Sequence, residues 1–148
     1  SLSLFPSAPV GAVVGFSGGR RLSPVFRPLV AGVAASVLAG GRSVAVGCAA
    51  GADAFVRAAA PGAVVFSVAA FGSGRSAFAR RSAALIRAVA AGGPGSGLVV
   101  FPLRLVLLAG SFRFGFRWFL WPRFWFVGAA ALAAGLGLPV VVFPCGFS

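Results

Sequence analysis

Short Val-rich runs alternate with Ala-rich stretches along this chain, and glycines separate most of them. The Val-rich runs have the length and composition of buried strands, and they cover residues 12–16, 43–47, 63–68, 98–101 and 140–143. The Ala-rich stretches are predicted helices over residues 24–39, 52–60, 76–91 and about 127–134. Such alternation is typical of a parallel sheet with helices on both faces. Because 148 residues suffice for one core, we expect a single domain over 1–148 with an α/β fold, a small doubly wound, Rossmann-like parallel sheet of about five strands.

The amino-acid composition changes how the charge is interpreted. Eight residue types are absent, namely Lys, Glu, Gln, Asn, His, Tyr, Met and Thr. Each of them needs adenine in its codon, so we infer a coding strand almost free of adenine. The formal net charge of +12 is then largely a coding consequence, because Arg is the only basic residue that such a strand can encode. The basic charge therefore argues less strongly than usual for a nucleic acid or an anionic membrane as partner.

The same composition leaves few side chains for catalysis or metal binding. Cys48, Cys145 and Asp53 are the only ones that could hold a metal or move a proton near neutral pH, fewer than the usual ligand set of a zinc site. We therefore expect no metal and no cofactor, and we lean towards a protein that is not an enzyme. The two cysteines are expected to be small buried residues, and their spacing defines no disulfide. Because no secretory signal with a charged n-region is visible, we expect a cytoplasmic location.

Two glycine-rich turns follow the first two predicted strands, at the strand ends where parallel sheets bind ligands. The first turn, residues 15–20 (GFSGGR), offers glycine N–H groups and an arginine to a phosphate, although such turns also simply permit tight geometry. The second turn, residues 47–53 (GCAAGAD), has small residues that let a ligand approach, and it ends on the only acid of the chain. Asp53 either belongs to a ligand site or stabilises the N-terminal amides of the following helix.

A pair of arginines in the third predicted helix is another candidate. Arg80 and Arg81 follow Phe78 closely, so they could pair with phosphate while the ring stacks on a base. The alternative is a solvated helix face with Phe78 in the core.

These segments resemble, in order and spacing, the Rossmann-like core of the DNA-processing protein A and lonely-guy (SLOG) superfamily. The resemblance covers about residues 12–101 and 127–146, and the pattern G-x-A-x-G-x-D at 47–53 is its most specific part. It implies non-catalytic binding of a nucleotide, a nucleotide-derived ligand or single-stranded DNA at the carboxyl ends of the strands. The phosphoribohydrolase branch has a catalytic glutamate and a glycine-rich loop that this chain lacks, so that activity is not expected. The resemblance places Ser17, Gly18 and Arg20 at the phosphate turn, Gly51 and Asp53 at the second turn, and Arg80 and Arg81 on the helix beside the site. Together with Gly19 and Gly47 of the same two turns, these are the candidate site residues.

The stretch 103–126 fits neither a helical nor a strand period, and it contains all three tryptophans. We interpret it as an anomalous insertion that is read out of frame, because a shift of one nucleotide turns Trp codons into Gly codons and Phe codons written UUC into Ser codons. One alternative is a membrane-associated hydrophobic protein, since residues 124–148 carry no charge. Another is a non-functional product. We favour a nucleotide or single-stranded nucleic acid as partner over a membrane, and the sequence does not specify the oligomeric state.

Overall fold

The computed structural model describes residues 11–101, 137–143 and 145. Within these ranges, five parallel strands form one sheet in the order β3-β2-β1-β4-β5. The strands are β1 (Val13–Gly18), β2 (Ser43–Gly47), β3 (Val64–Phe66), β4 (Gly97–Phe101) and β5 (Val140–Val142). Strand β1 lies at the centre of the sheet, with β2 and β3 on one side and β4 and β5 on the other. The switch point of the strand order therefore lies between β1 and β4. The predicted α/β Rossmann-like sheet is confirmed.

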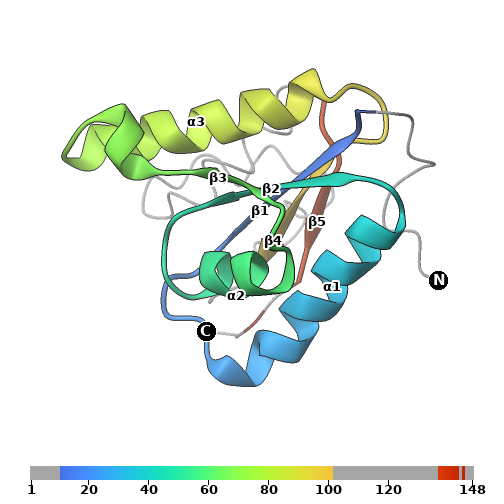
Figure 1. Ribbon diagram of the computed structural model, residues 1–148. Coiled ribbons are helices and arrows are strands. Elements are labelled where there is room, and N and C mark those ends of the chain that lie inside the picture. Colours follow the sequence, from blue (N-terminus) through green and yellow to red (C-terminus); the bar gives the residue numbers. More distant parts are fainter. Residues whose placement is uncertain (1–10, 102–136, 144, 146–148) are drawn as a thin grey trace, which may run out of the picture.

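Helices cover both faces of the sheet (Figure 1). They are α1 (Arg27–Ala39), α2 (Ala52–Ala59) and α3 (Arg75–Ala91), and two 3₁₀ helices, η1 (Pro24–Phe26) and η2 (Val68–Phe71), precede α1 and α3. The first face packs α1 and α2 on strand side chains such as Phe16 and Val99. The second face packs α3 on Leu98 and Val100. Side chains alternate between the faces because successive residues of a strand point in opposite directions.

Strand β4 is buried along its whole length, as expected of a central strand in a parallel sheet. Its last residue, Phe101, stacks on Phe16 of β1 with ring centroids 6.3 Å apart and on Phe143 with centroids 5.5 Å apart. These rings join β1, β4 and the segment after β5 on the face that carries α1 and α2. The last residue of β4 is therefore packed against both β1 and the segment after β5.

Several elements differ from the expected bounds for tertiary reasons. Strand β1 continues to Gly18 because this residue pairs with Phe101 of β4. The third expected strand, 63–68, is reduced to Val64–Phe66, since the chain turns into η2 directly afterwards. The last strand pairs with β4 as Val140–Val142. The expected helix at 127–134 and the anomalous stretch 103–126 lie outside the described residues.

Three further expectations concern cysteines, membranes and metals. Cys145 is buried in the core on the α1 and α2 face, whereas Cys48 is half-buried, and both are free thiols. None of the helices in the described part of the chain combines the length and the apolar character that crossing a bilayer requires. In the same ranges, no three metal-ligating side chains come together.

Candidate functional site

The two glycine-rich turns interlock at the carboxyl ends of the strands. The N–H group of Gly19 donates to the Phe101 carbonyl at 3.1 Å, and the Gly19 carbonyl accepts from the Ala52 N–H group at 3.1 Å. The first turn is thus tied to the end of β4 on one side and to the start of α2 on the other. As a consequence, the Gly19 N–H group is already used within the fold.

Gly51 makes this interlock sterically possible. Its φ of +71° lies in the region that favours glycine. A Cβ atom on Gly51 would come within 2.3 Å of the Gly19 carbonyl oxygen. The first turn therefore rests directly on the backbone of the second turn.

Arg57, on α2, holds the second turn in place. Its Nη1 atom donates to the carbonyl oxygens of Gly47 at 2.8 Å and of Ala49 at 2.9 Å. On the other side of the turn, the Asp53 Oδ2 atom accepts from the Ala49 N–H group at 3.3 Å. Arg57 was not predicted as a site residue. The available signal was its position four residues after Asp53, which puts both on the same face of a helix.

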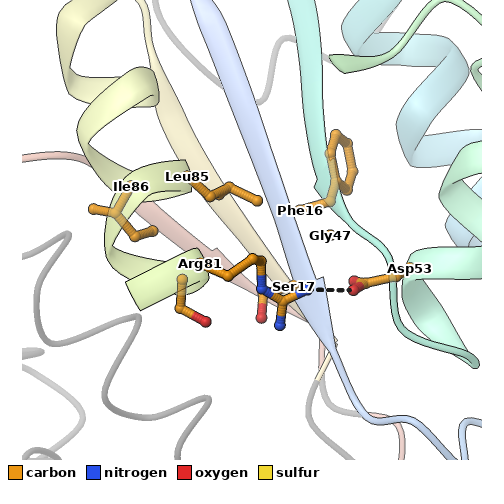
Figure 2. Close-up of a pocket in the computed structure, with 8 residues that line it drawn as sticks. Phe16, Ser17, Gly47, Asp53, Arg81, Leu85 and Ile86 are labelled. Carbon is orange, nitrogen blue, oxygen red and sulfur yellow. Dashed lines mark ion pairs between the residues drawn. The ribbon is translucent and has the colours of Figure 1, made fainter. Parts of the chain in front are cut away.

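Asp53 and Arg81 meet over the end of β2, and Figure 2 shows Arg81 reaching from α3 past Ser17 towards Asp53 on α2. The Arg81 Nη1 and Asp53 Oδ2 atoms are 3.7 Å apart, and both residues are buried, with exposed fractions of 2% and 5%. Gly47 leaves the space for this ion pair, because a Cβ atom there would lie 2.0 Å from the guanidinium of Arg81. The ion pair thus connects helices that cover opposite faces of the sheet.

A small cavity surrounds the ion pair. Its volume is about 10 Å³, the space of about one water molecule. Four of the predicted site residues line it, namely Ser17, Gly47, Asp53 and Arg81. The other lining residues, which were not predicted, are Phe16, Ser82, Leu85 and Ile86. A whole nucleotide therefore does not fit inside, and a ligand of that size has to lie over the surface of this edge.

Burial dominates the electrostatics of Asp53. It raises the pKa of this carboxyl to about 6, while Arg81, the Ala49 N–H group, Arg57 and Arg20 oppose the rise. Asp53 is therefore mostly ionised at neutral pH and neutral in mildly acidic solution. Because the chain contains one acidic side chain and no histidine, this carboxyl dominates the titration of the folded protein near pH 5 to 6.

The first prediction is that acid stabilises the fold. The folded-state pKa of Asp53 lies above the unfolded value, so the free energy of unfolding should fall as pH rises from about 4 to about 6 and then level off. The expected decrease is about 2–3 kcal/mol, measured by urea unfolding at constant ionic strength. In the Asp53→Asn variant the curve should be flat over the same range. A wild-type stability that increases with pH would contradict the prediction.

The two other arginines of the predicted site lie on the surface. Arg20 is exposed, and its guanidinium lies over the Phe78 ring, 4.4 Å from the centroid. Arg80 is also exposed, but it turns towards η2, where its Nε atom donates to the Phe71 carbonyl at 3.1 Å. The structure thus brings Arg81 to Asp53 and Arg20 to Phe78, and it does not bring Arg80 into the cavity.

The strand order and the interlocked turns define an α/β protein with a Rossmann-like sheet. Among solved structures, the chain is similar to DNA processing protein A from Helicobacter pylori, whose structural report describes its binding of single-stranded DNA. The two share 18% sequence identity with a TM-score of 0.59, over 92% of this chain and 69% of that one. No protein-family model and no curated protein matches the chain. The similarity therefore establishes the fold.

Proposed function

We propose that the chain binds single-stranded DNA, without catalysis, at the carboxyl edge of its sheet. The fold similarity to a protein that binds single-stranded DNA supports this proposal. The proposed site consists of Ser17, Gly18, Gly19, Arg20, Gly47, Gly51, Asp53, Arg80 and Arg81. The glycines shape the two turns, while Arg20 and Arg80 present exposed charge.

The observation that carries the proposal is the stacking of Arg20 on Phe78. A guanidinium that already lies on an aromatic ring provides a flat cationic surface for a base, and its charge attracts phosphate. Arg75, one helical turn before Phe78, is also exposed. Side chains for stacking and for phosphate contacts are thus available on one part of the surface.

Two features favour single-stranded DNA over a mononucleotide as the ligand. The cavity at the strand ends has a volume of about 10 Å³, too small for a base or a phosphate. The N–H group of Gly19, which could have held a single phosphate, donates to Phe101 instead. Contacts spread over the surface are better suited to a polymer, because each nucleotide adds a phosphate and a base.

The second prediction tests this function by fluorescence anisotropy with a labelled oligo-deoxythymidine. Binding should weaken linearly in log affinity against log salt, and Arg20→Ala should lower the magnitude of that slope by about one unit because it removes one phosphate contact. Phe78→Ala should weaken binding by roughly 1–3 kcal/mol while leaving the salt slope unchanged, since stacking releases no counterions.

Arg87→Ala is the matched control, because Arg87 is an exposed arginine on α3, the helix that carries Phe78, but lies further along it. Equal losses for Arg20→Ala and Arg87→Ala would show only a diffuse charge effect and would contradict the proposed site. A mononucleotide that raises the melting temperature of the protein as much as the oligonucleotide does would contradict the preference for single-stranded DNA.

A further inference from the structure

Two arginines of the chain segment that follows β1 lie over phenylalanine rings on opposite faces of the sheet. The guanidinium of Arg20 lies 4.4 Å from the ring centroid of Phe78 on α3. The guanidinium of Arg27, the first residue of α1, lies 4.9 Å from the ring centroid of Phe55 on α2. Helices α2 and α3 cover opposite faces of the sheet (Figure 1). The proposed function uses only the first of these two stacks.

Both stacks lie at the carboxyl edge of the sheet. A helix that follows a parallel strand begins at the edge where that strand ends. Phe55 and Phe78 are each the fourth residue of their helix, so both rings belong to a first turn beside this edge. The backbone of Arg20 contacts the start of α2, since a Cβ atom on Gly51 would lie 2.5 Å from the Arg20 carbonyl oxygen. The two arginine side chains therefore leave one short segment towards opposite faces.

The hydrophobic core fixes the position of the second stack. Phe55 is buried on the face that carries α1 and α2, where Leu22 and Phe26 of the connecting segment also pack. Arg27 itself is exposed, so its guanidinium covers the ring from the solvent side. A guanidinium held in this way offers a flat surface to a base and positive charge to a phosphate.

We propose that single-stranded DNA crosses the carboxyl edge of the sheet and contacts Arg20 on the α3 face and Arg27 on the α1 and α2 face at the same time. This inference rests on the proposed binding of single-stranded DNA. It adds a second contact site and the path of the DNA between the two sites, neither of which the fold similarity provides.

The charge along this path suits the phosphate backbone of DNA. Arg21, which lies between the two arginines in the sequence, is also exposed. The first turn of α1 has no acidic residue, and the only acid of the chain, Asp53, is buried. DNA that crosses this edge therefore meets positive side chains and no exposed carboxylate side chain. The composition explains why arginine is abundant, but not why both arginine–phenylalanine stacks of the described residues lie at this edge.

The separation of the two faces sets a minimum length for DNA that reaches both stacks. Packed layers of secondary structure lie about 10 Å apart, so helices on opposite faces of one sheet are separated by about 20 Å. A stacked single strand of about six nucleotides has this length. A shorter oligonucleotide occupies one stack at a time, whereas a longer one gains affinity because its second contact forms within the same complex.

The experiment compares oligo-deoxythymidines of about three and about 12 nucleotides by fluorescence anisotropy over a series of salt concentrations. The affinity of the wild-type chain should rise steeply once the length exceeds about six nucleotides. Arg27→Ala should lower the affinity for the long oligonucleotide about tenfold, and the magnitude of its salt slope by about one unit. The affinity for the short oligonucleotide should fall at most about twofold, because that DNA still binds at Arg20.

Two further variants make the comparison specific. Arg27→Lys should keep the salt slope but lose part of the affinity for the long oligonucleotide, since an ammonium group keeps the charge without the flat stacking surface. Arg87→Ala is the control for general loss of charge, because Arg87 is exposed near the other end of α3. It should lower the affinity for both lengths by the same small factor.

The outcomes separate this inference from the function on which it rests. If Arg27→Ala binds the long oligonucleotide as tightly as Arg87→Ala does, the crossing path is overturned and the binding of single-stranded DNA at Arg20 remains. An equal loss for the short and the long oligonucleotide would also overturn the path, because one DNA molecule would not then join the two contacts. The absence of wild-type binding at both lengths would overturn the proposed function as well. The length dependence of Arg27→Lys decides the question even if Arg27→Ala does not fold.

Discussion

The Gly51→Ala variant is expected to lose about 3 kcal/mol or more of unfolding free energy. Part of the loss is backbone strain, because φ is +71° and ψ is −126° at this residue, a combination that alanine rarely adopts. The rest is collision, since the added methyl group would lie 2.3 Å from the Gly19 oxygen and 2.5 Å from the Arg20 oxygen. Backbone atoms cannot move aside as a flexible side chain does. Moving the two turns apart to relieve this collision would break the hydrogen bond between the Ala52 N–H group and the Gly19 carbonyl.

Two other glycines serve as matched controls for this variant. Gly41 has φ of +82° but open space around it, so Gly41→Ala measures backbone strain without collision, about 1 kcal/mol. Gly62 has neither a positive φ nor a neighbour within 4 Å, so Gly62→Ala should change stability by less than about 0.5 kcal/mol. Urea unfolding of the three variants gives the comparison. Equal losses at Gly51 and Gly41 would show that the turns do not rest on each other.

Local sequence patterns predicted most of the sheet, and the exceptions arise from pairing between distant segments. The residues of β2 were predicted with the correct bounds, because the apolar run 44–46 lies between Gly41 and Gly47. The extension of β1 to Gly18 depends on pairing with Phe101, which no local pattern shows. The short β3 similarly ends where the chain turns into η2.

The site shows a similar division between local and tertiary information. Asp53 and Arg81 were both predicted as site residues, but a sequence does not show that they pair with each other across the sheet. The helical period does separate Arg80 from Arg81, because consecutive residues of a helix point about 100° apart. Arg81 shares its helix face with Ala77 and Leu85, which are buried, whereas Arg80 is exposed.

The last prediction is that removing Arg81 alone destabilises the fold more than removing both members of the Asp53–Arg81 ion pair. Arg81→Met leaves a buried carboxylate without the guanidinium that opposes its desolvation most strongly. Losing one partner of a buried pair typically costs about 3–5 kcal/mol, and we expect a loss of this size at neutral pH. The double variant Asp53→Asn with Arg81→Met leaves no buried charge at this position. It should therefore be more stable than Arg81→Met alone, so the two changes are not additive.

The pH dependence shows which buried charge causes the loss. In Arg81→Met the pKa of Asp53 should rise above its wild-type value of about 6, because Arg81 is the largest influence that lowers it. Lowering the pH to about 5 protonates the carboxyl, so this variant should regain much of its stability in acid. The stability of Asp53→Asn should not change with pH over the same range, because the guanidinium that it leaves behind stays charged at every pH that the fold tolerates. Additive losses in the double variant, or equal recovery of both single variants in acid, would mean that the ion pair does not couple the two helices.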